Sequence, residues 1–340
     1  MTSEPEESDA ADRLINEGVA TGRFEIDDPC AYECASAPWE ILVEPIALGP
    51  LAHCKDFLVT SSLILYREDF KGPIRVRGMS PPGMLAVGLP LRVGGRSRYW
   101  GAAPGGSTLP ATLPGALDIV FDDGQEHLVV LVALDLLRAS LPEDVVDALE
   151  RSAARRQLPV RRHGIDAFGR WLLTIIEAAK RRADPVSLAA LSRTVEGELP
   201  WRLVAACCFD KAAASLRKIP ARYRALDRAM AFLREADIAS VQVGDLCRAP
   251  AETPRTLECG FRDGLGLSPL RFVRLLRLHW ARRELAAAQA GTTTVADIAD
   301  RLGLLHHSRF AADYAALFGE MPSQTLARPP FRPATPLLPA

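Results

Sequence analysis

The sequence predicts an α+β fold, with a β-rich half followed by a helical half. Short apolar segments between Gly- and Pro-rich turns, such as SPPG at 80–83 and APGG at 103–106, favour a small barrel or sandwich over residues 25–135. After Leu134 apolar residues recur with helical spacing, and two stretches near the C-terminus repeat one pattern.

Size and composition set the broad class. The chain has 340 residues, of which 48% are hydrophobic and 24% charged, as in soluble proteins of about two domains. The most apolar stretch, LVVLVALDLL at 128–137, contains Asp135 and is too short to cross a membrane. Seven scattered cysteines and an acidic N-terminus without a signal pattern favour reduced thiols. We therefore expect a cytoplasmic protein without a membrane partner.

The pattern along the chain divides it into five segments. We expect a disordered tail at 1–20, a β-rich domain at 21–140, a helical region at 141–220, a second helical domain at 221–328 and a disordered tail at 329–340. The last helical domain carries a net positive charge and the remainder a net negative charge. This asymmetry weakly indicates that the C-terminal domain meets a polyanion.

Six apolar segments are predicted to be strands. They are WEILVEPIAL (39–48), KDFLVTSSLILYREDF (55–70), IRVRGM (74–79), GMLAVGLPLRV (83–93), ALDIVF (116–121) and HLVVLVAL (127–134). Because Asp-Gly tolerates positive φ, DDGQE between the last two segments predicts a hairpin.

The helical region carries a broad apolar stripe. Five of its residues are spaced i, i+3, i+4, i+7, i+8: Phe168, Trp171, Leu172, Ile175 and Ile176. Packing against the protein's own sheet and a homodimer interface both remain open. A helix from 186 to 217, interrupted near Pro200, is expected next, and the basic run over 151–162 reads as a solvated face or a nucleic-acid contact.

Residues 241–266 and 293–319 repeat one another. The matched pairs are Val243 with Val295, Asp245 with Asp297, Leu246 with Ile298, Leu257 with Phe310, Phe261 with Tyr314, Gly266 with Gly319 and Pro269 with Pro322. One residue is inserted between the two halves of the second copy, which a turn tolerates and a helix does not. Each copy therefore predicts two helices joined by a short turn.

Capping residues support this interpretation. Thr253, followed by Pro254, is suited to begin one second helix, Thr294 caps the helix over 295–302, and Gly303 and Gly319 end helices. Two short helices joined by a tight turn form a helix-turn-helix, whose second helix enters the major groove of DNA. A repeat that serves only for packing is the alternative.

One helical pattern connects the two copies. Ser268 is suited to cap a helix that continues to Gln289, with a length of about 33 Å. One turn of B-DNA is about 34 Å. A stiff connector of that length would hold two reading helices over successive major grooves.

The stretches RTLECGFRDGLGLSPLRFVRLLRLHWARREL and TVADIADRLGLLHHSRFAADYAALFGEMPSQTL resemble the AraC/XylS family of bacterial transcription regulators over residues 222–328. GMLAVGLPL and SRYWG more distantly resemble the ethanolamine-regulator-like branch. The resemblance implies a cupin-like effector-sensing β domain, dimerisation helices, a homodimer, a bipartite DNA-binding domain and an activator that works with RNA polymerase at promoters. It implies no cofactor.

The resemblance also places the residues that meet double-stranded DNA. They are Thr253, Arg255, Thr256, Glu258 and Arg262 in the first unit and His306, His307, Ser308 and Arg309 in the second. Arg255 is suited to guanine and Glu258 to cytosine. Cys259 and Ala312 stand where the family commonly has a basic residue, and Asp313 adds negative charge without a predicted role. We therefore expect weak electrostatic affinity and a second unit that positions more than it specifies.

An effector site and rival functions complete the predictions. Arg98, Tyr99 and Trp100 follow flexible glycines and are suited to a carboxylate or cationic metabolite, although aromatic residues filling the barrel are the alternative. His53 and His127 stand apart in the sequence, so neither a metal site nor an enzyme is expected. The rival function is a regulator that keeps the fold but docks on polymerase or another regulator.

Overall fold

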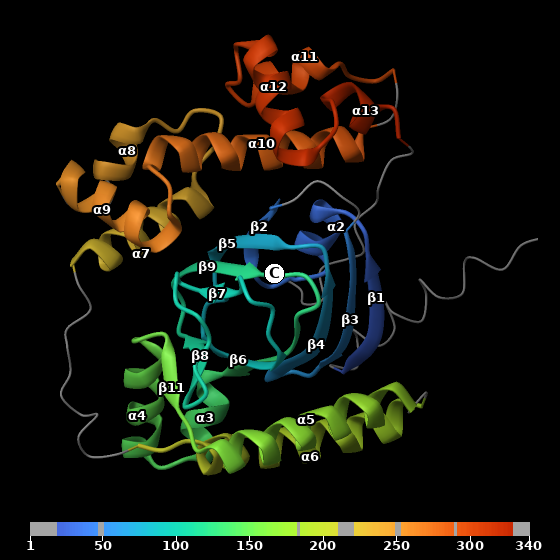
Figure 1. Ribbon diagram of the computed structural model, residues 1–340, viewed down its shortest axis with the longest axis vertical. Helices are drawn as coiled ribbons and strands as arrows, with labels where there is room; N and C mark the ends of the chain where they lie inside the picture. The colour runs from blue at the N-terminus through green and yellow to red at the C-terminus, as the bar shows by residue number, and fades with distance from the viewer. Residues whose placement is uncertain are drawn as a thin grey trace, which may run out of the picture.

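The computed structural model describes residues 19–46, 51–181, 184–209, 221–248, 253–288 and 291–328. The α+β class is confirmed: antiparallel sheets form the N-terminal half and helices the C-terminal half. In Figure 1 the C-terminal helices lie above the smaller sheet, the larger sheet lies below it, and the helices α5 (Arg162–Arg181) and α6 (Pro185–Ala206) lie at the bottom.

The larger sheet has seven strands in the order β1-β3-β4-β10-β6-β8-β11, with antiparallel neighbours. Their bounds are Ala20–Ile26 (β1), Ala52–Val59 (β3), Leu63–Lys71 (β4), Glu126–Ala133 (β10), Met84–Arg92 (β6), Thr108–Thr112 (β8) and Gln157–Pro159 (β11). β10 is buried on both faces because Leu128 and Val130 point to the helices while Val129 and Leu131 point to the barrel interior.

The smaller sheet has the order β2-β5-β9-β7, also antiparallel. Its strands are Glu40–Pro45, Ile74–Met79, Ala116–Phe121 and Arg98–Tyr99. Its inner face contributes Ile41, Val43 and Val76 to the core between the sheets. Its outer face contributes Leu42, Met79 and Ala116 to the core of the C-terminal helices. One apolar core therefore runs from this sheet into the helical domain.

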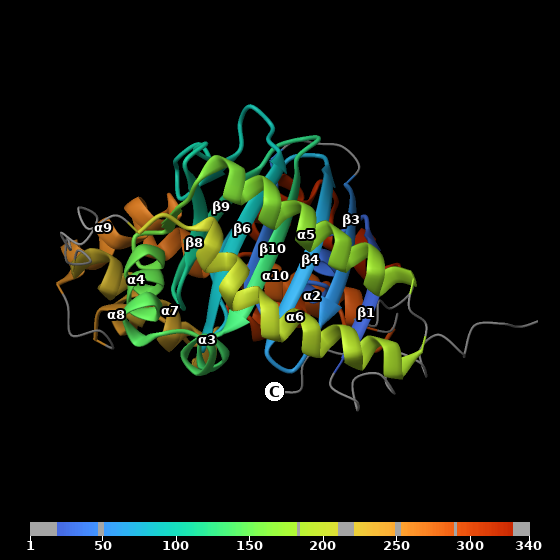
Figure 2. The same ribbon diagram turned by 90° about the horizontal axis from the view of Figure 1, so that it is seen from below.

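Four helices cover the larger sheet, namely α3 (Leu134–Ser140), α4 (Glu143–Ala153), α5 (Arg162–Arg181) and α6 (Pro185–Ala206). Figure 2 shows α5 and α6 running side by side across its strands. α6 continues through Pro200 rather than breaking there as predicted. No helix in the described ranges is long and apolar enough to cross a membrane.

The C-terminal domain consists of seven helices within the described residues. They are α7 (Ala221–Glu235), α8 (Val243–Arg248), α9 (Pro254–Leu265), α10 (Pro269–Ala287), α11 (Val295–Arg301), α12 (His307–Phe318) and α13 (Pro322–Leu326). α10 crosses above the smaller sheet, with α7–α9 near one of its ends and α11–α13 near the other (Figure 1). A further short helix, α2 (Pro29–Cys34), lies between β1 and β2 and contacts α10.

Other predictions meet the structure as follows. The expected hairpin over DDGQE is wrong, because β9 belongs to the smaller sheet and β10 to the larger, so this turn connects the sheets. Segment 55–70 forms two paired strands, β3 and β4. The predicted tails lie outside the described residues except for Val19 and Ala20, and Ala20 begins β1. The helix expected to reach 217 is shorter than predicted, because α6 ends at Ala206 and Cys207 adopts an extended conformation; residues 210–217 lie outside the described ranges.

Candidate nucleic-acid interface

The first helix-turn-helix unit consists of α8 and α9. Thr253 caps α9, since its hydroxyl accepts a hydrogen bond from the backbone N–H of Thr256 at 3.2 Å. Leu257 and Phe261 are completely buried on the inner face of α9. Gly260 brings α9 close to α7, because a Cβ there would lie 2.3 Å from the Arg222 carbonyl oxygen. The opposite face of α9 is left toward solvent.

The second unit, α11 and α12, follows the same plan. Thr294 and Asp297 form a capping box at the start of α11, with the Thr294 N–H donating to Asp297 Oδ2 at 2.9 Å. The first unit repeats this contact, as the Gln242 N–H donates to Asp245 Oδ2 at 2.8 Å. Phe310 and Tyr314 are buried where Leu257 and Phe261 are buried in α9. The predicted repeat is therefore present in three dimensions.

Both reading helices end alike. Gly266 after α9 has a φ of 66° and Gly319 after α12 has a φ of 74°, so each adopts the left-handed conformation that ends a helix. Pro269 begins α10 directly after the first unit, and Pro322 begins α13 directly after the second.

α10 joins the two units without a break. Its 19 residues, capped by Ser268, make it about 28 Å long, somewhat shorter than predicted because Ala288 leaves the helical conformation. Arg277 holds the first unit, donating to the carbonyl oxygens of Ile238, Ala239 and Val241 at 3.0 Å each.

Several charged residues of the two units form ion pairs within the chain. Asp313 of α12 accepts a hydrogen bond from Arg274 of α10, so its negative charge fixes the second reading helix on the linker. In the first unit, Arg262 Nε donates to Glu258 at 2.9 Å. The pairing occupies the carboxylate that was predicted to read cytosine.

The predicted DNA contacts lie mostly on the surface. Of these residues Thr256 and Glu258 are half-buried, and the others are exposed: Thr253, Arg255, Arg262, His306, His307, Ser308 and Arg309. His307 Nε2 lies 2.7 Å from Asp300 Oδ1. Among the described residues, neither Arg255 nor Arg309 has an ion-pair partner. These two guanidinium groups stand near the first turn of each reading helix.

The predicted effector residues separate in the structure. Arg98 hydrogen-bonds the carbonyl oxygens of Gly95 and Ser97, and Tyr99 is buried in the barrel with its hydroxyl accepting from Gln125 Nε2 at 3.0 Å. Trp100 is half-buried, and its indole N–H donates to the Ala116 carbonyl oxygen at 3.0 Å.

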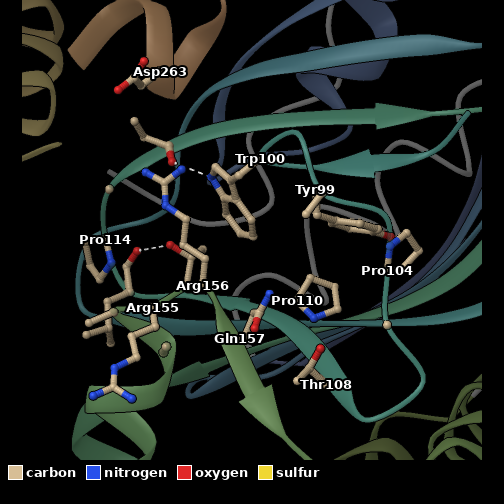
Figure 3. A pocket seen from close by; sticks show the side chains of 18 of the residues that line it. Tyr99, Trp100, Pro104, Thr108, Pro110, Pro114, Arg155, Arg156, Gln157 and Asp263 are labelled. Carbon is tan, nitrogen blue, oxygen red and sulfur yellow. Dashed lines mark hydrogen bonds between the residues drawn. The ribbon is translucent and has the colours of Figure 1, made fainter. Parts of the chain in front are cut away.

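Trp100 and Tyr99 line a cavity of about 510 Å³ at the junction of the two domains. The Arg156 guanidinium stacks over the Trp100 ring at 5.0 Å (Figure 3), while Arg155 and Gln157 follow the end of α4. In the described chain, Trp100 and Arg156 are the non-glycine residues with positive φ, at 49° and 65°. Such backbone strain concentrates at functional sites.

The C-terminal domain forms another wall of this cavity. Asp263 of α9 enters it from the helical side (Figure 3), and Asp227 of α7 also lines it. Asp227 Oδ1 accepts a hydrogen bond from the Ala116 N–H at 2.9 Å. Burial raises the pKa of the Asp227 carboxyl, although that hydrogen bond and the charge of Arg156 act against the shift.

The predicted dimerisation stripe is covered within the chain. Phe168, Leu172, Ile175 and Ile176 are buried in the core beneath the larger sheet. Trp171 is half-buried and carries the Arg202 guanidinium over its ring at 4.7 Å. Of the two interpretations left open, the structure supports packing on the protein's own sheet for these residues.

The barrel encloses a polar cluster that no sequence pattern indicated. Glu68 accepts hydrogen bonds from Lys55 at 2.9 Å and from Tyr32 at 2.9 Å, and His127 Nε2 lies 2.8 Å from it. Although burial opposes ionisation, the charge of Lys55 and the contact with His127 lower the pKa of Glu68 to about 2. His127 therefore has a partner in the fold, Glu68, that lies far from it in the sequence.

No sequence pattern predicted the contact between α2 and α10. Glu33 is buried, and its carboxylate lies 2.7 Å from His279 Nδ1 and 2.6 Å from Arg283 Nη2. Asp28, the N-cap of α2, pairs with Arg282. Burial opposes ionisation of Glu33, but His279 and Arg283 hold its pKa below the usual value. These pairs tie the linker helix to the β domain.

Comparisons with known proteins agree with this arrangement. Residues 246–328 match the family described as a helix-turn-helix domain. The "Probable thc operon regulatory protein" of Rhodococcus erythropolis is 30% identical over 168 residues, which is 48% of this chain and 51% of that protein. The "XylDLEGF operon transcriptional activator 2" of Pseudomonas putida is 30% identical over 101 residues, 30% of this chain and 64% of that protein. The chain thus spans about half the length of the first relative and less than two thirds of the second.

The crystal structure of the AraC-like transcriptional activator CuxR has 17% sequence identity and a TM-score of 0.39, covering 77% of this chain and 96% of that chain.

Proposed function

We propose that the chain is a transcription regulator of the AraC/XylS family, which its C-terminal domain resembles, that it binds promoter DNA with both helix-turn-helix units, and that it activates transcription in response to a small-molecule effector. The observation that carries this proposal is the continuous α10, which holds two similar reading helices with their first turns exposed.

Each reading helix offers one arginine for bases. Arg255 and Arg309 stand near the start of α9 and α12, where a recognition helix meets base edges, and a guanidinium pairs bidentately with guanine. Thr253, at the N-terminus of α9, is suited to a phosphate. Base reading is therefore expected mainly from Arg255, while Arg309 is expected chiefly to position the second unit in its groove.

The length of α10 supports binding to adjacent grooves. At about 28 Å it is close to one turn of B-DNA. Because Arg277 anchors the first unit to α10 and Arg274 anchors the second, the spacing between the units is stiff. The two units would then enter successive major-groove segments on one side of the duplex.

We place the effector in the cavity beside Trp100. A molecule there would touch Trp100 and Arg156 of the β domain together with Asp227 and Asp263 of the C-terminal domain. The stacked guanidinium and indole are suited to a planar group with an anionic or hydrogen-bonding substituent. Occupancy would change how the two domains contact each other, which is how an effector alters DNA binding.

The proposal also includes a homodimer, a cytoplasmic location and RNA polymerase as a partner. A homodimer would form through the outward faces of α5 and α6, where Trp201 and Val186 are exposed, since the inner stripe is covered. We expect the protein to work in the cytoplasm with RNA polymerase as a partner and without an enzymatic activity. The cupin-like character of the β domain stays a prediction.

Salt dependence tests the proposal. Binding of the full-length protein to selected genomic fragments, measured by fluorescence anisotropy, should weaken by about a hundredfold between 50 and 200 mM salt, because released counterions drive such binding. The double variant Arg255→Ala/Arg309→Ala should show a shallower slope. Arg92→Ala, which removes an exposed arginine of the β domain, is the matched control and should have the same slope as the unsubstituted protein.

The rival function predicts another result. A regulator that docks on polymerase or another regulator would show no preference among duplexes and a slope that is the same in all three proteins. The internal use of Arg274, Arg277, Arg282 and Arg283 is the observation that favours this rival.

A further inference from the structure

α2 is a short element that connects the two domains. Its six residues, Pro29–Cys34, hold Arg282 through the N-cap Asp28 and His279 and Arg283 through Glu33. Glu33 Oε1 also accepts a hydrogen bond from the Val43 N–H at 2.9 Å, which joins α2 to β2. A small distortion of α2 would therefore reach the linker helix directly.

Two cysteines lie on either side of Glu33 on this helix. Cys30 and Cys34 are one turn apart and face the same side, Cys30 buried and Cys34 half-buried. Both line a cavity of about 620 Å³ between α2, β2 and α10, together with Trp280 and Arg283. The cavity gives a small oxidant access to both sulfur atoms.

The two thiols have unequal surroundings. A hydrogen bond from Cys30 and then the charge of Arg283 lower the pKa of Cys34 to about 7, against burial and the charges of Glu33 and Asp28. The same hydrogen bond, with burial, raises the pKa of Cys30. Cys34 is thus the thiolate and Cys30 the proton-bearing neighbour, the arrangement of a nucleophile and a resolving thiol.

We propose that Cys34 and Cys30 form a peroxide-responsive thiol pair that loosens the contact between α2 and the linker helix. Its effect on transcription rests on the proposed function, but its chemistry does not. The Cys34 thiolate attacks one oxygen of hydrogen peroxide, an S–O bond forms and the O–O bond breaks, giving a sulfenic acid and hydroxide, which is protonated to water. Cys30 sulfur then attacks Cys34 sulfur, the S–O bond breaks, and the released hydroxide takes the Cys30 proton as a second water.

Closing this bond must strain the helix. Cβ atoms four residues apart on a helix are separated by about 5–6 Å. A disulfide needs about 3.5–4.5 Å. α2 therefore has to distort when the pair is oxidised, and Glu33 moves with it. Because His279 and Arg283 depend on the buried Glu33 carboxylate, the β domain and α10 lose part of their contact.

Other cysteines provide the comparison. Burial raises the pKa of Cys207 to about 12, which keeps it a thiol. Its neighbour Cys208 is half-buried like Cys34, but lies far from α2, after the end of α6. Cys208→Ser is therefore the matched control.

The test treats the full-length protein with equimolar hydrogen peroxide at pH 7. Peptide mapping should find Cys30 and Cys34 joined, with the loss of two hydrogens and reversal by dithiothreitol. Cys30→Ala should instead accumulate a sulfenic acid on Cys34 that a dimedone probe labels, formed more slowly because the hydrogen bond from Cys30 is lost, and Cys208→Ser should behave as the unsubstituted protein. Unoxidised Cys34 should react with iodoacetamide about tenfold faster than Cys208, because the lowered pKa of Cys34 increases its thiolate fraction.

A second measurement reads the domain contact without DNA. Hydrogen exchange over Pro269–Ala287 should become faster after oxidation and stay unchanged in Cys34→Ser treated in the same way. Oxidation that reaches Cys208 or Cys54 before Cys34 would overturn the proposal, as would a disulfide that leaves exchange in α10 unaltered. Absence of DNA binding by the reduced protein would contradict the proposed function and leave these results standing.

Discussion

The two helix-turn-helix units share one apolar plan but differ in how they are held. In the first unit, α9 packs on α7, and polar contacts to the β domain lie near the protein surface, such as Arg75 Nη2 with the Leu265 carbonyl oxygen at 3.3 Å. The second unit adjoins the half of α10 that carries the buried Glu33–Arg283 pair. Two units with the same fold are therefore coupled differently to the β domain.

A polar chain extends that coupling into the second unit. The Tyr314 hydroxyl lies 2.7 Å from Thr325 Oγ1, which donates to Glu320 at 2.8 Å, and Glu320 accepts from Arg282 at 2.9 Å. Arg282 reaches Asp28 of the β domain. In the first unit Phe261 occupies the place of Tyr314 and has no hydroxyl to join such a chain.

The largest effect is expected from Glu33→Gln. Removing this buried charge leaves Arg283 and His279 without their anion, which costs about 3–5 kcal/mol of the free energy of unfolding. Glu284→Gln breaks the exposed Glu284–Arg301 pair and should cost at most about 1 kcal/mol. Urea denaturation of both variants measures the difference, and equal losses would show that the Glu33 contact is not buried in solution.

Acidification should change the stabilising contributions of Glu33 and Asp227 in opposite directions. The pKa of Glu33 is lowered by His279 and Arg283, so its contribution is present above about pH 4.5 and is lost as the pH falls through its folded value. The pKa of Asp227 is raised by burial, so protonation relieves a cost and stability there rises on acidification. Hydrogen exchange at pH 7 and pH 4 should therefore show faster exchange in α10 than in α7 at the lower pH. Faster exchange in α7 would contradict this sign.

The DNA-facing sides of the units should also differ. Arg255→Ala should cost about 1–3 kcal/mol of specific binding and relax the base preference at one position. Arg309→Ala should cost less and act more evenly across sequences, because the second unit is expected to position rather than specify. Competition binding with randomised duplexes measures both, and an equal loss of discrimination would show that both units read bases.

Tyr314→Phe makes the second unit resemble the first. It removes one buried hydrogen bond to Thr325 and should lower the free energy of unfolding by about 1 kcal/mol. The counterpart in α9, Phe261, is a buried phenyl ring at the matching position of the first unit. A stability unchanged within error in thermal unfolding would mean that Tyr314 does not link the second unit to Arg282.

The smallest differences are expected at the helix caps. Thr253→Ala and Thr294→Ala should each cost about 1 kcal/mol or less, with the larger loss at Thr294, because that residue takes part in a capping box. Circular dichroism during thermal unfolding compares the two variants with each other. The reverse order would indicate that Thr253 has contacts beyond its cap.

Local patterns carried most of the correct predictions. Thr253, Ser268 and Thr294 cap helices as expected, since a cap depends on residues within one turn. Gly266 and Gly319 end their helices for the same reason. Contacts between residues within one helical turn can therefore be predicted from the local sequence.

The wrong predictions concern features that depend on contacts between segments distant in the sequence. The Asp-Gly turn at 123–124 connects two sheets, because the partners of β9 and β10 are β5 and β4 rather than each other. α6 passes through Pro200 since packing on α5 and the sheet outweighs one missing hydrogen bond. Glu33 meets Arg283 from across the chain, so no local spacing indicates the pair.

Footprinting tests the central claim most directly. Guanine-methylation interference on a selected promoter fragment should reveal two major-groove clusters about 10 base pairs apart, of which Arg255→Ala removes one and Arg309→Ala weakens the other. A single cluster altered by both variants, or clusters on opposite sides of the duplex, would contradict a stiff linker that places two reading helices in successive grooves.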